Sequence, residues 1–201
     1  MLLSSPVADA PRMVCRPERR APKAIAFVDV ETTGLDPSRH DIVEIGVVRV
    51  DADTLMVQGE KSVLVKPERL FDAEDEALAI NGFSMAAWKH ALPLREALAV
   101  VLPLLDRALI AGHNVAFDWS FLTASFRRAD LALPSVDHHR LDTASLAWPL
   151  MASGEIESLS LDSVCRYLGI ERRRPHRALD DARCSYLVAL RLLDRMREVR
   201  A

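Results

Sequence analysis

The sequence predicts an α/β fold in which helices pack on the faces of a mixed sheet. Residues 25–30 are apolar on both alternating faces, which is typical of a central strand that is covered on both sides. Two further strand patterns follow after short connections, and later strand patterns alternate with helical ones. This order indicates an antiparallel part of the sheet that comes first and a parallel part that follows it.

The first half of the chain is expected to form three strands and two helices. Residues 41–51 and 59–68 read as strands that complete an antiparallel meander with the first one. A short helix is predicted over 75–80, and the Asn-Gly pair that follows it is a typical helix end. A longer helix is predicted over 93–108.

The second half of the chain alternates strands with helices. Residues 109–114 and 135–141 read as the fourth and fifth strands, with a helix over 116–130 between them. This alternation favours parallel pairing of the later strands. Three more predicted helices complete the chain, over 143–151, 158–170 and 177–199.

Chain length and local composition predict one domain and an arm. The 201 residues suit a single domain, 24–201, preceded by a basic arm, 1–23. The arm holds four prolines and five basic residues, so it is predicted to be disordered. Two interpretations of the arm stay open, a tail without a role and a segment that binds an acidic partner.

The overall composition indicates in which compartment the protein works and which kinds of partner it binds. The net charge of −3 excludes a bulk positive field, although a local basic stripe can still bind nucleic acid. Apolar runs fall short of the roughly 18 residues of a membrane span, and the apolar start is too short for a signal peptide. Cys15, Cys165 and Cys184 are odd in number and lack metal-type spacing, which favours free thiols and a cytoplasmic location.

Four acids occupy positions that face the core at the ends of predicted elements. Asp29 and Glu31 end the central strand on the same face, because strand residues alternate with period two. Asp118 lies on the apolar face of the helix that follows the fourth strand. In the last helix, Asp181 heads an apolar stripe, whereas Asp180 is expected to meet solvent.

Convergence of these acids would require compensation of their charge. Two unit charges about 4 Å apart repel by about 4 kcal/mol at an effective dielectric constant of 20. Either some carboxyls are protonated, with raised pKa values, or cations bind between them. Oxygen ligands suit Mg²⁺ or Mn²⁺, and two such ions can bind the attacking and leaving oxygens of a phosphodiester. Taken singly, each acid also fits a solvated strand end or a helix-dipole partner.

Three motifs resemble those of the DnaQ-like 3′–5′ exonucleases of the DEDDh group, which includes the DNA polymerase III epsilon subunit, ribonuclease T and oligoribonuclease. They are DVETTGL at 29–35, HNVAFDWSFL at 113–122 and HRALDDA at 176–182, and their order and separation also match. The likeness runs from about Ala24 to the C-terminus. It implies an RNase H-like fold, a five-stranded mixed sheet with three antiparallel strands and then parallel strands, flanked by helices.

The resemblance also implies the roles of the acids. Asp29, Glu31, Asp118 and Asp181 would hold two divalent cations, Mg²⁺ or Mn²⁺. His176 would be the general base that takes a proton from the attacking water. Five residues turn a helix by about 140° beyond one full revolution, so His176 and Asp181 cannot share a helical face. His176 is therefore expected on the loop before the last helix.

In this family the turn after the first strand grips the terminal nucleotide. The resemblance implies that backbone N–H groups of Thr32, Thr33 and Gly34 serve this purpose, and that glycine permits a close approach. Leu35 would wedge against the last base, and Phe117 would supply an apolar face. An ordinary glycine turn with apolar core residues is the alternative for this segment.

Several other polar residues near the motifs invite a role. His113 and Asn114 are expected to contact the nucleotide or to order their loop. His138 and His139 are expected at the surface or at a sheet edge, because adjacent strand residues face opposite sides. Asp142 is a predicted helix cap.

Two basic clusters are candidates for contacts with the phosphate backbone. They are Arg127-Arg128 and Arg172-Arg173-Arg174, and the second lies next to His176. A solvated helix face or loop is the alternative for both clusters.

The resemblance implies a metal-dependent exonuclease that releases nucleoside 5′-monophosphates from single-stranded or frayed 3′ ends. DNA is slightly favoured, because the first two motifs look closest to those of the epsilon-type proteins. The alternative is a 3′–5′ exoribonuclease that acts on RNA ends or short oligoribonucleotides. The chain ends about 20 residues after Asp181, which favours a free-standing nuclease or a loose association with a DNA polymerase. The intact set of five catalytic positions argues against a non-catalytic nucleic-acid-binding or interaction module, and no membrane partner is expected.

Overall fold

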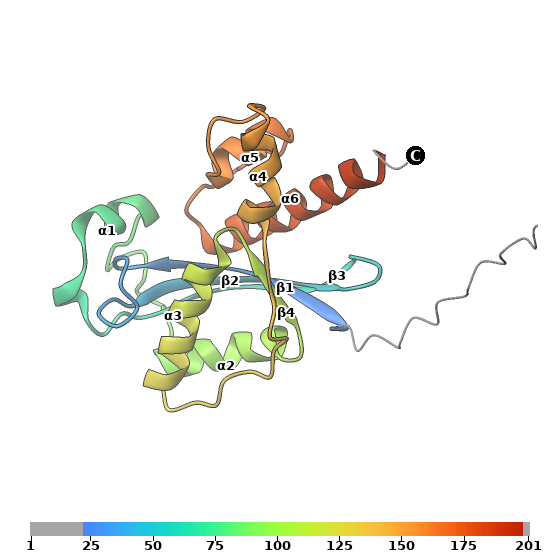
Figure 1. Ribbon diagram of the computed structural model, residues 1–201. Coiled ribbons are helices and arrows are strands. Elements are labelled where there is room, and N and C mark those ends of the chain that lie inside the picture. The colour runs from blue at the N-terminus through green and yellow to red at the C-terminus, as the bar shows by residue number, and fades with distance from the viewer. Residues whose placement is uncertain (1–21, 199–201) are drawn as a thin grey trace, which may run out of the picture.

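The computed structural model describes residues 22–198 and contains a five-stranded sheet with the strand order β3-β2-β1-β4-β5 (Figure 1). Strand β2 runs antiparallel to both β1 and β3, whereas β4 runs parallel to β1 and β5 runs parallel to β4. This topology confirms the predicted fold class. The strands are β1 (Ala24–Thr32), β2 (Ile42–Asp51), β3 (Val57–Leu64), β4 (Leu109–Gly112) and β5 (Arg140–Asp142).

Helices cover both faces of the sheet (Figure 1). On one face, α2 (Leu94–Leu105) and α3 (Val115–Arg128) pack in one core cluster with the buried side chains of Val28 and Val30 of β1. On the other face, α6 (Ala178–Glu198) packs in a second cluster with Phe27. Burial on both sides of β1 confirms the prediction of a central strand.

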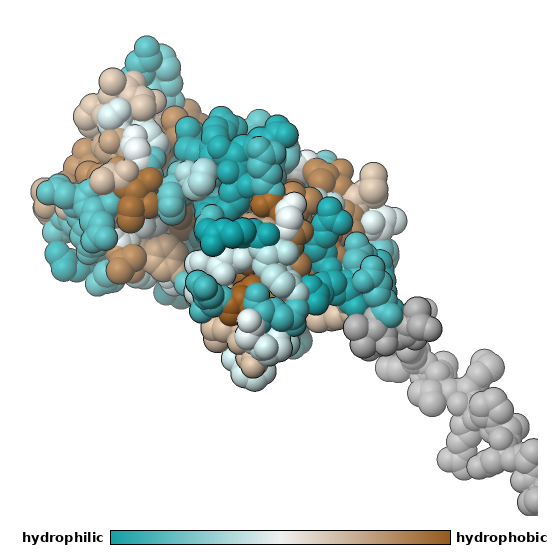
Figure 2. Space-filling view, turned by 90° about the horizontal axis from the view of Figure 1, so that it is seen from above, coloured by the Kyte–Doolittle hydropathy of each residue, from teal (hydrophilic) through white to brown (hydrophobic). Residues whose placement is uncertain are grey.

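A satellite core holds the last three helices together. Helices α4 (Thr143–Ala152) and α5 (Leu161–Tyr167) pack against α6 around buried Val164 and Val188. These helices lie above the sheet in Figure 1. Figure 2 shows the molecule from that side, and the centre of this surface is mostly hydrophilic. The cysteines at 165 and 184 are buried in this core as free thiols, as predicted, whereas position 15 lies outside the described residues.

A short helix and a 3₁₀ turn lie beside the end of β1. Helix α1 (Asp75–Asn81) ends at Gly82, which has the left-handed φ of 67° and confirms the predicted helix end. The 3₁₀ turn η1 (Leu70–Asp72) precedes it. The Asn81 side chain donates a hydrogen bond of 3.0 Å to the Thr32 carbonyl, which ties α1 to the last residue of β1.

Two strands differ from their predicted extents. Strand β3 spans 57–64 rather than 59–68, because the backbone N–H groups of Glu68 and Arg69 bond to the Asp41 carboxylate instead of a neighbouring strand. Strand β5 comprises only 140–142, so the first five residues of the predicted strand at 135–141 were wrongly assigned. In that segment the Ser135 carbonyl accepts the N–H of Arg107 and the N–H of Asp137 donates to the Ala108 carbonyl, so two backbone bonds hold it beside the residues that precede β4.

The described residues bear only partly on the predicted arm and domain. The predicted arm falls on residues 1–21 and 22–23, of which only the last two are described, and the single domain at 24–201 stays a prediction. Within residues 22–198, the structure contains no helix with both the length and the apolar character needed to cross a membrane.

Candidate active site

The carboxyl end of β1 carries two of the four acids, and a hydrogen bond attaches the third. Pairing between β1 and β4 ends at Phe27, which leaves later backbone groups of β1 available. The N–H of Val30, which lies between Asp29 and Glu31, donates a bond of 3.0 Å to Oδ1 of Asp118. This bond holds the first turn of α3 beside the strand end, so the first and second motifs meet as predicted.

A glycine lets the fourth acid reach the same place. Gly46 of β2 is paired in register with Asp29, and the start of α6 crosses directly over it. A Cβ at Gly46 would lie 2.1 Å from the carbonyl carbon of Ala178, closer than any non-bonded atoms can approach. The missing side chain therefore brings the first turn of α6, and with it buried Asp181, against β1.

Glu31, His176 and Asp181 converge at this end of the sheet. Each offers one ligand atom, and the three atoms lie within 4.8 Å of one another. His176 is exposed and adopts a left-handed φ of 61° in the loop before α6, which confirms its predicted position. Its backbone N–H donates a bond of 3.0 Å to Oδ2 of Asp181. The loop thus holds the histidine against the acid that follows it by five residues.

Burial, together with the charges of neighbouring carboxylates, raises the pKa values of three of the acids. Burial, followed by the charges of Asp118, Glu31 and Asp181, raises the pKa of Asp29 well above its usual value. Burial and the nearby charges of Asp181 and Glu44 raise the pKa of Glu31 to about 7. Burial raises the pKa of Asp118 to about 7, although the bond from Val30 opposes the shift. The structure thus contains the repulsion that the sequence predicted for a converging set of acids.

Arg172 compensates part of this charge. Its Nη2 lies 2.7 Å from both Oδ1 and Oδ2 of Asp181, and its Nε lies 3.2 Å from Oδ1. The sequence made Arg172 a candidate for contacts with the phosphate backbone, and in this structure its guanidinium is directed into the acid cluster. The two following arginines also pair with acids, Arg173 with Glu171 at 3.5 Å and Arg174 with Asp180 at 2.8 Å.

Asp180 was predicted to be exposed to solvent, but its side chain is largely buried. It lies between Arg174 and Arg183, 2.8 Å and 3.2 Å away. Helical periodicity places it about 100° from the apolar stripe, but Arg174 of the preceding loop and Arg183, which also pairs with Glu60 of β3, lie against it. Asp180 is therefore a structural ion-pair residue, and Asp181 is the acid that reaches the cluster.

Sequence reasoning missed an ion pair beneath the histidine loop. Glu44, in β2, is fully buried and accepts bonds from Arg177 Nε at 2.8 Å and Nη2 at 3.2 Å. Ser62 donates a third bond, of 2.7 Å, to the same carboxylate. The available signal was an acid in an otherwise apolar strand together with an arginine next to His176.

Asp41 was also missed, and it organises the turn after β1. Its buried carboxylate lies 3.0 Å from Arg69 Nε and 3.1 Å from Arg128 Nη2. Its backbone N–H donates to Thr33 Oγ1, and the Thr33 N–H donates in return to the Asp41 carbonyl at 2.9 Å. Arg128 is therefore a structural partner of Asp41, whereas Arg127 is exposed.

The expected nucleotide-binding turn divides into a fixed part and an open part. The Thr33 N–H is bonded to the Asp41 carbonyl in this structure, and its predicted contact with a nucleotide stays a prediction. The side chain of Thr32 donates to the Gly34 carbonyl at 2.7 Å, and a Cβ at Gly34 would lie 2.5 Å from the His40 ring. Leu35 is 74% exposed, which leaves it available for the contact with a base that the sequence predicts.

The second motif supplies both loop-ordering and apolar groups. His113 Nδ1 lies 2.9 Å from Thr143 Oγ1, and Nε2 lies 2.6 Å from the Leu159 carbonyl oxygen. Both ring nitrogens therefore have protein partners, which favours the loop-ordering alternative for His113. Asn114 is exposed with a left-handed φ of 62°, and half-buried Phe117 packs against Phe121 with ring centroids 4.9 Å apart.

Asp142 caps α4 as predicted. Its Oδ1 accepts the N–H of Ala144 at 2.9 Å, two residues along the helix. The same oxygen accepts the N–H of Asn114 at 3.0 Å. This cap therefore also links the start of α3 to the start of α4.

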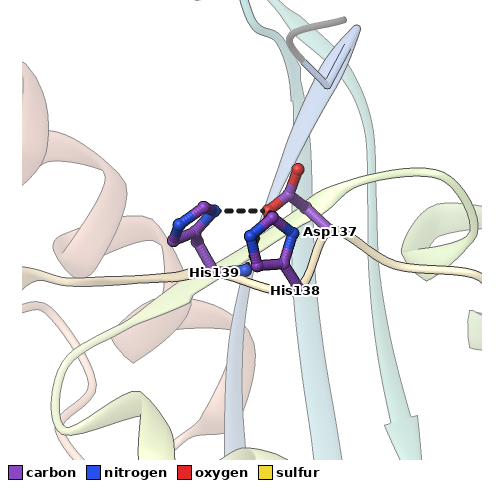
Figure 3. Close-up of side chains that lie close together, drawn as sticks. All are labelled: Asp137, His138 and His139. Carbon is purple, nitrogen blue, oxygen red and sulfur yellow. Dashed lines mark hydrogen bonds and ion pairs between the residues drawn. The ribbon is translucent and has the colours of Figure 1, made fainter.

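A separate cluster, Asp137, His138 and His139, lies on the connection between α3 and β5 (Figure 3). Both histidines are exposed, as predicted, but their rings lie side by side with centroids 3.8 Å apart instead of facing opposite sides. The reason is that 138–139 lie in a bend before β5. His139 Nδ1 lies 3.1 Å from Asp137 Oδ1, an interaction that needs no metal.

Comparison with known proteins gives a consistent result. The family model of ribonuclease T, described as Exonuclease, matches residues 26–189. The PolC-type DNA polymerase III of Thermotoga maritima is 34% identical over 174 residues, which cover 86% of this chain but only 12% of the polymerase. Ribonuclease T of Marinobacter nauticus is 30% identical over 190 residues, which cover 86% of this chain and 83% of that protein.

A solved structure shares the fold. Exonuclease I of E. coli, in complex with a dT13 oligonucleotide, superposes with a TM-score of 0.71 at 20% identity, covering 89% of this chain and 42% of that protein. The matched residues 26–189 contain all three sequence motifs and every acid of the cluster. The chain belongs to the ribonuclease T-like exonuclease family, the DnaQ-like group that the three DEDDh motifs indicated.

Proposed function

We propose that this chain is a metal-dependent 3′–5′ exonuclease that releases nucleoside 5′-monophosphates. The observation that carries the proposal is the convergence of Glu31, His176 and Asp181 within 4.8 Å, next to the Asp118–Val30 bond. A titratable histidine beside clustered carboxylates suits phosphodiester hydrolysis, in which a proton moves while negative charge accumulates on oxygen.

The donor set fits two hard divalent cations, Mg²⁺ or Mn²⁺. Asp29, Glu31, Asp118 and Asp181 offer carboxylate oxygens, the ligands that these ions prefer. Burial raises the pKa values at 29, 31 and 118, and the neighbouring negative charges add to the shift, so bound cations would compensate these charges. When bound, such cations supply positive charge that stabilises both the attacking and the leaving oxygens of the phosphodiester.

Other residues of the chain would transfer the proton and bind the terminal nucleotide. His176 is exposed beside Glu31 and Asp181, where its side chain can accept a proton from the attacking water. The exposed Leu35 and half-buried Phe117 offer apolar contacts to the terminal base. Asn114 is exposed just before α3 and is a candidate for a polar contact with the nucleotide. His113 orders the loop through both of its ring nitrogens.

A single-stranded or frayed 3′ end is the proposed substrate. Crystals of E. coli exonuclease I contain a dT13 oligonucleotide, and the similar fold supports a comparable strand path here. DNA is the favoured polymer, because the PolC-type polymerase of Thermotoga maritima is a relative at 34% identity. That likeness also supports a loose association with a DNA polymerase.

RNA is the second candidate substrate. The observation that favours it is the match to ribonuclease T of Marinobacter nauticus over 83% of that protein. The alternative activity is the trimming of RNA ends or short oligoribonucleotides by the same cluster of carboxylates and histidine.

Digestion of 5′-labelled oligonucleotides tests the proposal. Matched DNA and RNA strands in Mg²⁺ should shorten from the 3′ end and release 5′-mononucleotides, and EDTA should stop the reaction. Asp29→Ala should lower the rate by roughly a thousandfold or more. The exposed turn variant Asp53→Ala is the matched control and should keep full activity. Undiminished activity of Asp29→Ala, or products shortened from the 5′ end, would contradict the proposal.

A further inference from the structure

We infer that Arg172 is a built-in counterion for Asp181 that a divalent cation has to displace, and that Asp162 receives the arginine when it leaves. This inference rests on the proposed metal-dependent function. It concerns the energetics of metal binding rather than the chemistry of the reaction.

All hydrogen-bonding capacity of the Asp181 carboxylate is already in use. A carboxylate has about four lone-pair positions. Four N–H contacts reach Asp181: Arg172 Nε and Nη2 on Oδ1, and Arg172 Nη2 and His176 N on Oδ2, at 2.7 to 3.2 Å. A cation that takes an oxygen of Asp181 as a ligand must therefore displace at least one of these contacts, and three of the four come from Arg172.

Charge and burial make the two cations competitors. The Arg172 side chain is 11% exposed, so its guanidinium is held away from water and depends on a carboxylate for compensation. Bidentate arginine–carboxylate pairs are among the strong charge-assisted contacts. With Asp29, Glu31 and Asp118 close by, Arg172 is the positive group that directly neutralises Asp181 in the metal-free protein.

A second acceptor for Arg172 lies within reach. Nη1 of the same guanidinium is 3.9 Å from Oδ1 of Asp162, in the first turn of α5. The Asp162 side chain is 54% exposed and also pairs with Arg166, so part of its capacity is open to a new partner. A rotation of the Arg172 side chain would exchange Asp181 for Asp162 and keep a carboxylate beside the guanidinium. The arginine thus has two discrete positions, one for each state of the metal site.

The exchange makes specific predictions for metal affinity. Removing the positive charge at 172 should tighten binding of Mn²⁺, because the cation no longer competes with a resident arginine. Removing the negative charge at 162 should weaken binding, because Arg172 then loses its second position. The effect of the 162 substitution should disappear when Arg172 is also replaced, since both substitutions act through the same side chain.

Calorimetric titration of the purified full chain with Mn²⁺ tests these predictions. Arg172→Gln should bind Mn²⁺ about tenfold more tightly, which corresponds to about 1.4 kcal/mol. Arg173→Gln, an exposed neighbour, is the matched control and should stay within about twofold of the natural protein. Asp162→Asn should bind several-fold more weakly, and Arg166→Gln controls for the loss of the pair that Asp162 makes with Arg166.

Thermal melting in EDTA and in Mn²⁺ gives a second readout that does not depend on activity. Arg172→Gln should melt at a lower temperature in EDTA and show a larger rise with Mn²⁺, because its acids are uncompensated until the ion binds. Arg172→Lys keeps the charge without the bidentate contact, so its melting temperature in EDTA should lie between those of the natural protein and Arg172→Gln. It replaces Arg172→Gln in the test if that variant does not fold.

The outcomes separate this inference from the proposed function. Mn²⁺ binding that Asp29→Asn abolishes, but that Arg172→Gln leaves unchanged or weakens, would overturn the exchange while the metal-dependent function stands. An Asp162→Asn effect that persists unchanged in the Arg172→Gln background would also overturn it. A natural protein and an Arg172→Gln variant that both fail to bind Mn²⁺ would overturn the inference and the proposed function together.

Discussion

Glu44 and Arg177, 133 residues apart in the chain, form a two-point ion pair between the start of β2 and the loop that carries the histidine. Glu44 is 1% exposed, and its oxygens lie 2.8 Å and 3.2 Å from the guanidinium nitrogens. Because Arg177 directly follows His176, the pair fixes the root of the loop on β2. The loop therefore derives its position from a strand that contributes none of the proposed metal ligands.

Glu44→Gln should reduce activity, because it loosens this loop and also removes a charge that raises the pKa of Glu31. We expect kcat to fall about tenfold, because the proposed general base, His176, moves. KM should change little, because the contacts with the terminal nucleotide remain. The free energy of unfolding should fall by about 1–3 kcal/mol, less than for a fully buried pair, since the Arg177 side chain is 41% exposed and can turn to water. Steady-state kinetics and urea unfolding measure both quantities.

Glu60→Gln is the matched control for that variant. Glu60 pairs with Arg183 at the surface of the same side of the sheet, away from the histidine. It should change kcat by less than twofold. Equal losses of kcat in both variants would show that the Glu44 pair does not act through the loop.

The metal-free protein should lose stability as the pH rises through neutrality. Glu31 and Asp118 have folded pKa values of about 7, raised from 4.5 and 3.8, and the pKa of Asp29 is also raised. Between about pH 4, where the unfolded carboxyls ionise, and about pH 7, where the folded ones do, the folded protein holds protons that the unfolded chain releases. Their contribution to stability is therefore complete below about pH 4 and is lost as the pH rises through about 7.

Urea unfolding in EDTA at about pH 5.5, 7 and 8.5 measures this dependence. Asp118→Asn keeps an acceptor oxygen for the Val30 N–H but cannot ionise, so its stability should fall less steeply, by on the order of 1 kcal/mol over the range. Saturating Mg²⁺ should flatten the curve of the natural protein, because the ion stabilises the charged carboxylates. A metal-free stability that rises between about pH 5.5 and 8.5 would contradict the shared electrostatics of the cluster.

Gly46→Ala should disrupt the contact between α6 and the sheet. A Cβ there would overlap the backbone of Ala178, which no side-chain rotation can relieve, so α6 must move away from Asp29. We expect a loss of about 1–3 kcal/mol in the free energy of unfolding and a loss of metal-dependent stabilisation. Gly59→Ala is the control, because its Cβ would meet only the flexible side chain of Leu104 at 3.3 Å. Unchanged Mn²⁺ binding in Gly46→Ala would mean that close docking of α6 is not needed to assemble the site.

Leu35→Ala should weaken substrate binding without affecting the fold. The side chain is 74% exposed, so its removal changes little buried apolar area and should alter the free energy of unfolding by less than about 0.5 kcal/mol. Loss of contact with the terminal base should raise KM roughly tenfold. Met56→Ala, an equally exposed apolar side chain at the turn before β3, should leave KM unchanged. A KM for Leu35→Ala equal to that of Met56→Ala would exclude the base contact.

Periodicity in the sequence was enough to orient most of the proposed site. Alternation along β1 placed Asp29 and Glu31 on one face, and the structure brings both to the cluster. Helical periodicity selected Asp181 over Asp180, and the helix rotation between Asp181 and His176 placed the histidine on a loop. These inferences succeeded because the direction of a side chain is set by the local backbone, which short-range patterns report.

Only the tertiary structure decided what stands opposite each of those side chains. It pairs Arg172 with Asp181, buries Glu44 under Arg177, and covers Asp180, which local pattern had assigned to solvent. It also requires a glycine at position 46, where a helix from the far end of the chain crosses a strand near its beginning. Periodicity states which way a residue points, whereas ion pairing and close approach depend on which distant segment the fold brings against it.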